Sequence, residues 1–411
     1  MTLPRRHPGR VRVLFTVSSW PTHYSAMVPL GWALQAAGHE LRVLCAPSQT
    51  AAVAGAGLPP VPLPGGMEVA VHNRLSYVRE ALAGQWPYPW TPLHPVTGAP
   101  MSTLDDYDAA AYAAGFAEAS AAAHDAAVGF ARQWRPDLVV HDPVSTEGLL
   151  AALVTGVPAV LALWGPVGTH EPAPVRILPD DLGDSFARHG VGPFGPELIR
   201  HVLDPCPDEV APAVRARRLP VRYVPYNGPG VPPAGMPRGA SKRVCVTWST
   251  ALSTMTGPRS YALPAIVAAL TGLGVETVLT ATREDAEALG PVPPGVRLLR
   301  RCPLYALLPE CDAVVHHGGA GSAMTALVSG TPQLAVTFAS EQACLAGRIA
   351  ASGAGRHLPG HTATVETIGA AVAALLEVPG HRRAAAGLRR AAVGRPTPVD
   401  VLPRLEELAA G

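Results

Sequence analysis

The stretch His316-His317-Gly318-Gly319-Ala320-Gly321-Ser322 joins a short apolar run at 313–315 to a helix-forming run at 323–328. The apolar run predicts a buried parallel strand, so the stretch is a turn between a strand and a helix. Glycines in such a turn let backbone N–H groups come close to an anion, and the helix dipole adds roughly half a positive charge. The stretch therefore predicts a phosphate or diphosphate site. A glycine-rich turn that only packs the helix on the sheet is the alternative.

The glycine spacing argues against two common nucleotide motifs. Glycines at 318, 319 and 321 do not match G-x-G-x-x-G, and no Gly-Lys-Ser/Thr ending follows them. A histidine also stands where those motifs have none. A dinucleotide cofactor and ATP are therefore weaker candidates than another diphosphate.

Strands and helices alternate along the chain in two blocks of similar size. This pattern predicts an α/β fold of two doubly wound parallel-sheet, Rossmann-like domains that face a cleft. Ligands of such sheets bind at the carboxyl ends of the strands. The expected strands are 11–17, 41–45, 137–141, 159–163, 243–248, 276–280, 296–299, 313–315 and 333–336, and the expected helices are 27–36, 108–134, 147–155, 261–270, 323–328, 341–351, 365–376 and 401–410.

Proline and glycine content sets the expected domain limits. Residues 1–220 form the first domain, 221–240 a Pro/Gly-rich linker and 241–390 the second domain, and a helix at 391–411 can pack back on the first. Residues 59–106 are rich in proline and aromatic side chains, which indicates a binding loop or a mobile connection.

Composition excludes several classes of protein. With 48% hydrophobic and 15% charged residues, the chain is globular and not disordered. A net charge of +1 without a basic run argues against nucleic acid or an anionic membrane as partner. The uncharged window 148–165 is broken by Gly156-Val157-Pro158, so no membrane span is expected. No signal peptide is recognisable and the six cysteines form no Cys-x-x-Cys pair, which favours a reduced, cytoplasmic protein.

The chain resembles the GT-B, family 1 type glycosyltransferases that decorate natural products in actinomycetes. It is most similar to those that attach deoxysugars to aromatic polyketides such as angucyclines, some of which form C–C bonds. The segments that carry the resemblance are 316–322, Ser329-Gly330-Thr331-Pro332-Gln333, Glu341-Gln342, the opening 22–40 with Thr22-His23 and Val28-Pro29-Leu30, and the stretches 135–143, 163–166 and 222–228.

The resemblance implies roles for residues of the second domain. His317 hydrogen-bonds the donor diphosphate, whose charge grows in the transition state. Glu341 and Gln342 hold sugar hydroxyls, although capping of a helix is the alternative for Glu341. The remaining donor contacts implied are Gly319, Ala320, Gly321, Ser322 and Thr250 for the diphosphate, with a turn cap as the alternative for Thr250, and Arg301 and Cys302 for the base.

The resemblance also implies roles in the first domain. His23 is the general base for the acceptor, and Asp142 orients it; without the resemblance, a lone histidine after a strand is more often structural. Asp106-Tyr107-Asp108 has an Asp-x-Asp spacing, but its place before a helix favours N-capping, so no metal is expected. Trp20, Trp86, Trp90 and Trp164 are candidates for a flat aromatic acceptor site, with core packing as the alternative.

The resemblance therefore implies an inverting glycosyltransferase of antibiotic biosynthesis. It would move a deoxysugar from a dTDP-sugar, or a UDP-sugar, to an aromatic polyketide by O- or C-glycosylation, without a cofactor. The alternatives are a catalytically silent homologue that partners another transferase and a GT-B sugar-nucleotide epimerase. A helper protein or a homodimer is compatible with the resemblance.

Overall fold

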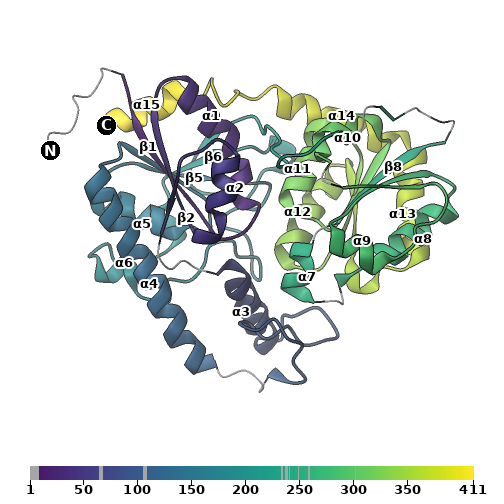
Figure 1. Ribbon diagram of the computed structural model, residues 1–411, viewed down its shortest axis with the longest axis horizontal. Helices are drawn as coiled ribbons and strands as arrows, with labels where there is room; N and C mark the ends of the chain where they lie inside the picture. Colours follow the sequence, from purple (N-terminus) through teal and green to yellow (C-terminus); the bar gives the residue numbers. More distant parts are fainter. Residues whose placement is uncertain are drawn as a thin grey trace.

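The computed structural model describes residues 9–411 except 64–67, 105–108, 233–234, 237–238, 240, 249, 258–259 and 301. It contains two α/β domains side by side, each built on a parallel sheet covered by helices (Figure 1). The predicted fold class is confirmed. No helix in the described part of the chain is long and apolar enough to cross a membrane.

The first sheet has the strand order β3-β2-β1-β4-β5-β6-β7. Its central strands are runs of branched and aromatic residues, and both faces of these strands are covered by other parts of the protein. Leu14 and Phe15, which are consecutive and point to opposite faces of the sheet, are therefore both fully buried. The elements are β1 (Arg12–Val17), α1 (Val28–Ala36), β2 (Glu40–Cys45), α2 (Thr50–Gly55), β3 (Pro60–Pro62), α3 (Val69–Leu82), α4 (Ala109–Trp134), β4 (Leu138–His141), α5 (Thr146–Thr155), β5 (Ala159–Ala162), α6 (Ser185–Arg188), β6 (His201–Asp204) and β7 (Arg217–Pro220).

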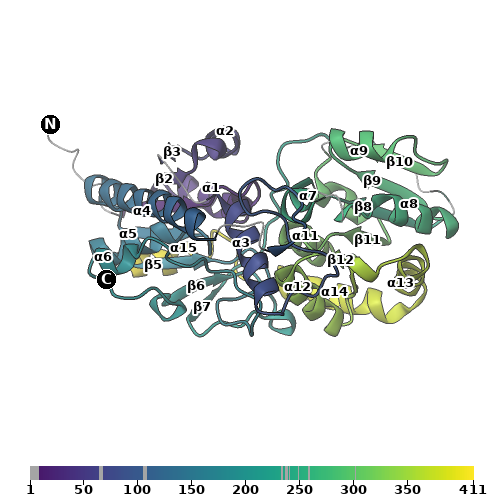
Figure 2. The ribbon, with the colours of Figure 1, turned by 90° about the horizontal axis from the view of Figure 1, so that it is seen from below.

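The second sheet has the order β10-β9-β8-β11-β12-β13. Figure 2 shows its helices on both faces of the sheet. The elements are β8 (Arg243–Thr247), α7 (Thr250–Thr256), α8 (Leu263–Gly272), β9 (Glu276–Thr280), α9 (Arg283–Leu289), β10 (Val296–Leu299), α10 (Leu304–Leu307), β11 (Ala313–His316), α11 (Ala320–Ser329), β12 (Gln333–Thr337), α12 (Ser340–Ala351), β13 (Gly355–Pro359), α13 (Val365–Glu377), α14 (Pro379–Val393) and α15 (Leu402–Ala410).

Both sheets reverse their winding direction between two central strands. In the first sheet β1 pairs with β2 on one side and with β4 on the other; in the second, β8 lies between β9 and β11. The loops after β1 and β4, and those after β8 and β11, therefore diverge. Such a point leaves a crevice at the carboxyl ends of the strands, where ligands bind.

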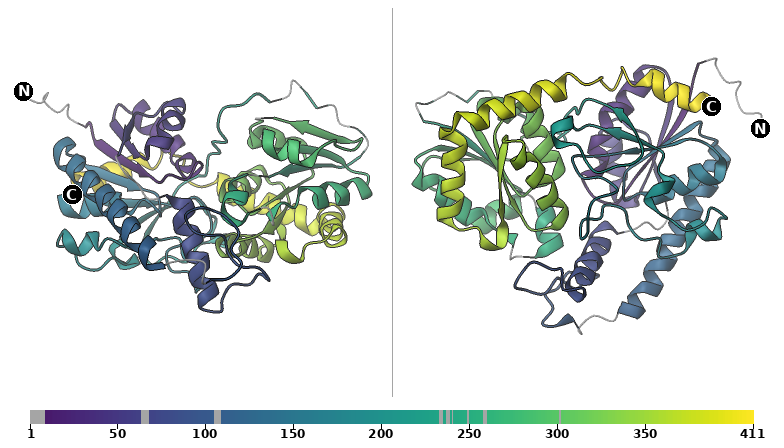
Figure 3. Two further views of the ribbon diagram at one scale, coloured as in Figure 1. Left: turned by 60° about the horizontal axis from the view of Figure 1, so that its bottom comes forward. Right: turned by 180° about the vertical axis from the view of Figure 1, so that it is seen from behind.

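The end of the chain returns from the second domain to the first. After α14, the segment crosses over, and α15 lies against the first domain (Figure 3). Val401, Leu402 and Leu405 are buried in the same apolar cluster as residues of β1 and β2, and His39 Nε2 lies 2.9 Å from Glu406 Oε1. The C-terminal helix thus ties the two domains together.

Several elements were not predicted from the sequence. Strands β3, β6, β7 and β13 are short, and three of them contain or end on proline, which obscures the apolar pattern of a strand. The helix α3 lies inside the Pro-rich segment that we expected to be a loop. The Asp-x-Asp sequence at 106–108 lies outside the described residues.

Candidate functional site

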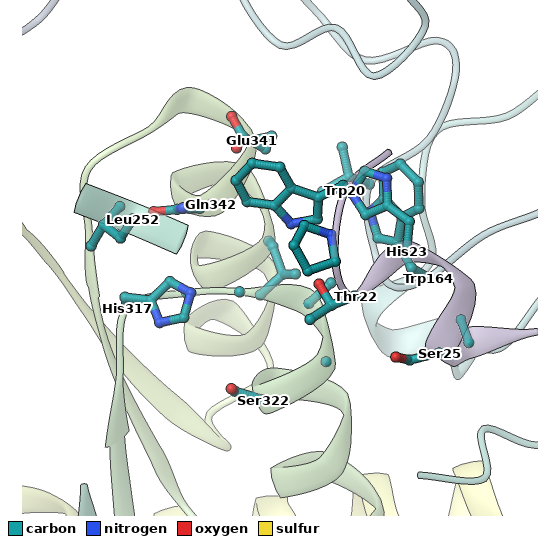
Figure 4. A pocket seen from close by; sticks show the side chains of 18 of the residues that line it. Trp20, Thr22, His23, Ser25, Trp164, Leu252, His317, Ser322, Glu341 and Gln342 are labelled. Atoms are coloured by element: carbon teal, nitrogen blue, oxygen red, sulfur yellow. The ribbon is translucent and has the colours of Figure 1, made fainter. Parts of the chain in front are cut away.

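A cleft of about 430 Å³ lies between the two domains. Its walls are the loops that follow β1 and β5 and one face of α3 on one side, and the ends of β8, β9 and β11 with the starts of α11 and α12 on the other. Figure 4 shows Trp20, His23 and Trp164 on one side of this cleft and Leu252, His317 and Gln342 on the other. The winding reversals of both sheets open into this single cleft.

The glycine turn forms the floor of the cleft on the second domain. Gly318 has φ +88°, and a Cβ there would lie 2.7 Å from Thr337 Cγ2, so the position requires glycine. Gly319 is the N-cap of α11, and the first N–H groups of a helix have no carbonyl partner within the helix. Ala320, Gly321 and Ser322 therefore offer donors to an anion.

The two histidines of the turn have different environments. His316 is fully buried: its Nδ1 accepts a hydrogen bond from Gly318 N at 3.0 Å, and its Nε2 donates to Gln333 Oε1 at 2.9 Å. It holds the turn in shape. His317 lines the cleft, and its buried Nδ1 has no hydrogen-bond partner in the described part of the chain. Burial, with a smaller effect of His316, lowers the pKa of His317 to about 3, so the ring is neutral at neutral pH.

The start of α12 brings the predicted sugar-binding pair into the cleft. Glu341 and Gln342 both line it, and Gln342 Oε1 accepts a hydrogen bond from Phe338 N at 3.2 Å. That bond leaves the Gln342 amide N–H₂ as a donor. Burial raises the pKa of Glu341. The pair offers both an acceptor and a donor for hydroxyl groups.

His23 stands at the carboxyl end of the first domain's central strand. Its Nδ1 lies 2.8 Å from Ser18 Oγ and 3.9 Å from Asp142 Oδ2. Asp142 is 1% exposed and accepts hydrogen bonds from the backbone N–H groups of Ser18, Val144 and Ser145, each at 2.8 Å. Burial lowers the pKa of His23 to about 4, and the charge of Asp142 opposes that shift. Asp142 therefore acts on His23 through its charge and through Ser18.

Two of the four predicted tryptophans line the cleft. Trp164 stacks on His23 with ring centroids 4.1 Å apart and fixes the plane of the imidazole, and Trp20 lies beside them. Trp86 and Trp90 do not belong to its lining: Trp86 packs against Tyr88, and Tyr88 stacks on Trp90. The structure thus places Trp86 and Trp90 in an aromatic cluster that adjoins the cleft through Tyr77 but does not line it.

The remaining predicted residues are placed as follows. Cys302 lines the cleft, Thr250 is the first residue of α7, and Arg301 lies outside the described residues. Within the described ranges, no group of three or more His, Cys, Asp or Glu side chains is arranged to hold a metal ion.

Among the features that sequence reasoning missed, two bear directly on the chemistry of the cleft. One is Ser18, the direct partner of His23. The other is the face of α3 that carries Asn73, Ser76, Tyr77 and Glu80. Their i, i+3, i+4, i+7 spacing is the signature of one helix face, and it could have been recognised within the Pro-rich segment.

Comparison with known proteins identifies the family. A family model of the erythromycin biosynthesis protein CIII-like N-terminal domain matches residues 32–249, and the corresponding C-terminal domain model matches residues 264–408. Aklavinone 7-beta-L-rhodosaminyltransferase of Streptomyces galilaeus is 36% identical, with 97% of this chain and 96% of that protein covered. TDP-daunosamine transferase DnrS of Streptomyces peucetius is 34% identical, with 97% of both chains covered.

Solved structures agree with this assignment. The spinosyn rhamnosyltransferase SpnG complexed with thymidine diphosphate is 30% identical, with a TM-score of 0.76 over 96% of this chain and 100% of that chain. The similarity spans both domains. The chain therefore belongs to the erythromycin biosynthesis protein CIII-like family and is a GT-B glycosyltransferase that uses a nucleotide-sugar donor.

Proposed function

We propose that the chain transfers a deoxysugar from a dTDP-sugar to an aromatic polyketide aglycone, with inversion at the anomeric carbon. Residues 1–220 bind the aglycone and residues 241–390 bind the donor. The observation that carries the proposal is that His23 and His317 line one cleft from opposite domains. The relatives named for rhodosamine and daunosamine transfer, and SpnG with its thymidine diphosphate, support the choice of donor.

On the donor side, the diphosphate is stabilised as it leaves. The N–H groups at the start of α11 and the neutral His317 donate hydrogen bonds to oxygens whose negative charge grows during transfer. One such preorganised donor contributes about 3–4 kcal/mol of transition-state stabilisation. Glu341 and Gln342 orient the sugar so that its anomeric carbon faces the first domain.

On the acceptor side, His23 removes a proton. The imidazole Nδ1 donates to Ser18 Oγ, which leaves Nε2 with a lone pair for the acceptor hydroxyl. Stacking on Trp164 holds the ring in place. The acceptor atom then attacks opposite the diphosphate, either as a phenolic oxygen or as the ring carbon beside it.

The experiment is product analysis by mass. The purified chain is mixed with a dTDP-deoxysugar and phenolic polyketides, and the product is treated with acid. A gain of one sugar mass shows transfer; release in acid indicates an O-glycoside and survival a C-glycoside. His23→Ala should abolish the gain, whereas His201→Ala, outside the cleft, should not.

A failed transfer is resolved by a binding measurement. If no product forms, titration with dTDP separates two cases. Binding of dTDP with no transfer to any aglycone points to a required helper protein or a silent homologue. Failure to bind dTDP would overturn the proposed donor.

A further inference from the structure

Glu80 has an unusual position for a carboxylate. It lies on α3 of the first domain, lines the cleft and is only 7% exposed. Its Oε1 accepts a hydrogen bond from Ser340 Oγ at 3.4 Å, across the domain boundary. Its Oε2 is buried and has no hydrogen-bond partner among the described residues. A buried charge of this kind is costly unless a partner of opposite charge compensates it.

A second carboxylate lies close to the first. Ser340 is followed in sequence by Glu341, which also lines the cleft. Burial, and then the charge of Glu341, raises the pKa of Glu80 to about 7. Two carboxylates from different domains therefore face the same space and repel each other while it is empty of cations.

No basic side chain of the described residues neutralises this pair. Neither Glu80 nor Glu341 forms an ion pair among those residues, and Arg176, which lines the same cleft, is engaged 2.7 Å from Asp180. The described residues also contain no group of three or more His, Cys, Asp or Glu side chains that could hold a metal ion here. In the empty cleft, protonation of Glu80 relieves this repulsion, and a cationic ligand would supply the charge that lets both carboxylates ionise.

Aromatic rings lie next to the carboxylates. Tyr77 lines the cleft one helical turn before Glu80, and the charges of Glu341 and Glu80 both contribute to a raised pKa of its hydroxyl, after burial. Trp20 also lines the cleft and packs in the same apolar cluster as Tyr77. Carboxylates combined with aromatic faces suit an alkylated ammonium group, because the rings attract the cation and cover its methyl groups.

We propose that Glu80 and Glu341 bind the protonated amino group of an amino-deoxysugar donor. The inference rests on the proposed function and specifies its donor class. Aliphatic amines are protonated at neutral pH, so the ligand supplies the positive charge that the pair lacks. A neutral sugar hydroxyl would need only one acceptor and would leave the second carboxylate uncompensated. Because Glu80 comes from the first domain, the ammonium group also draws the domains together over the donor.

The test compares two dTDP-6-deoxyhexoses that differ only by an amino or a hydroxyl group on the same carbon, C3 or C4. The ratio of their kcat/KM values should favour the amine, and Glu80→Gln should lower this ratio roughly 30-fold or more. Glu80→Asp, which keeps the charge, should retain part of the preference. Glu287→Gln, an exposed carboxylate on α9, should leave the ratio at the wild-type value.

A binding measurement gives a second readout that needs no turnover. In the empty cleft at pH 6, Glu80 is mostly protonated, and an ammonium group would force its ionisation. Calorimetry in buffers of different ionisation heat should therefore show proton release, up to one per amino donor bound. The release should be absent for the hydroxyl donor and for Glu80→Gln.

The outcomes separate this inference from the proposed function. Equal use of both donors, or a Glu80→Gln effect of the same size on both, would overturn the cation site while transfer itself stands. No transfer of either sugar by a chain that binds no dTDP would overturn the proposed function. Retained dTDP affinity of Glu80→Gln shows that the variant is folded.

Discussion

His23 Nδ1 lies 2.8 Å from Ser18 Oγ but 3.9 Å from Asp142 Oδ2, so the serine hydroxyl is the direct partner of the histidine. The carboxylate oxygens of Asp142 accept hydrogen bonds from three backbone N–H groups in the loops after β1 and β4. The carboxylate thus shapes the two loops at the winding reversal of the first sheet. Its effect on the base is electrostatic and indirect.

Ser18→Ala removes the hydroxyl that fixes the tautomer of His23 and keeps the backbone N–H that binds Asp142. We expect kcat to fall roughly tenfold, part of the 10²–10⁴-fold that base catalysis supplies. The thermal midpoint should change little. Steady-state kinetics with a melting curve checks both.

Asp142→Asn should behave differently from Ser18→Ala. The amide replaces one accepting oxygen by N–H₂, which then faces backbone donors, at a cost of about 1–3 kcal/mol in stability. Urea unfolding should show the loss together with a lower kcat. A fully stable Asp142→Asn protein would contradict the role assigned to the carboxylate.

The pH dependence of activity reports the environment of His23. A general base works when unprotonated, and burial lowers the pKa of His23 to about 4. With an uncharged donor sugar, kcat/KM should therefore show no acidic limb between pH 5 and 7, where an ordinary histidine would produce one. The limb should appear near pH 4, and fluorescence must show that the protein is still folded there. A limb at pH 6.5 would refute the low pKa.

Gly319→Ala tests the fit of His317 over the glycine turn. A Cβ at this position would lie 2.6 Å from His317 Nε2, so the ring must move. We expect weaker dTDP binding and a loss in kcat approaching the 10²–10³-fold that removal of one oxyanion donor causes. Gly347→Ala on α12 is the matched control, because a Cβ there meets nothing within 4 Å. Calorimetric titration with dTDP measures the difference.

Arg348→Ala tests the ion pair between the domains. Arg348 donates to both oxygens of Glu171, at 2.7 and 2.6 Å, and the Glu171 side chain is fully buried. Removing the guanidinium leaves an uncompensated buried charge, so we expect a loss of about 3 kcal/mol in urea unfolding. Arg283→Ala, which breaks an exposed pair, should cost less than about 0.5 kcal/mol.

The same ion pair predicts a dependence of stability on pH. Burial opposes ionisation of Glu171, but hydrogen bonds from Arg348, Ala213 N and Gly168 N hold its pKa below the usual 4.5. Because the pKa of Glu171 is lower in the folded than in the unfolded protein, its ionised carboxylate stabilises the fold at any pH above the unfolded-state pKa. This stabilisation is lost as the pH falls through the folded-state pKa. In Arg348→Ala, the fall in stability below pH 4.5 should therefore be shallower than in the wild type.

The amino-acid sequence was sufficient to locate the central strands and the candidate site residues that follow them. Runs such as Val13–Val17 and Ala313–Val315 are buried on both faces, so their largely apolar character is visible locally. Strands β3 and β7 and helix α3 escaped detection. They lie at sheet edges or beside prolines, where partial burial weakens the pattern.

The sequence by itself determined the two parallel sheets, the glycine turn and the histidines that follow strands, because apolar runs and left-handed glycines act through local preference. Only the tertiary structure decided which residues line the predicted cleft, that Ser18 stands between His23 and Asp142, and that Trp86 and Trp90 lie outside the cleft lining. It also decided the contact of Glu80 with Ser340, 260 positions away. Such contacts depend on how the two domains pack against each other. This packing produces no periodic pattern of hydrophobic residues in the sequence, so it cannot be predicted from the sequence alone.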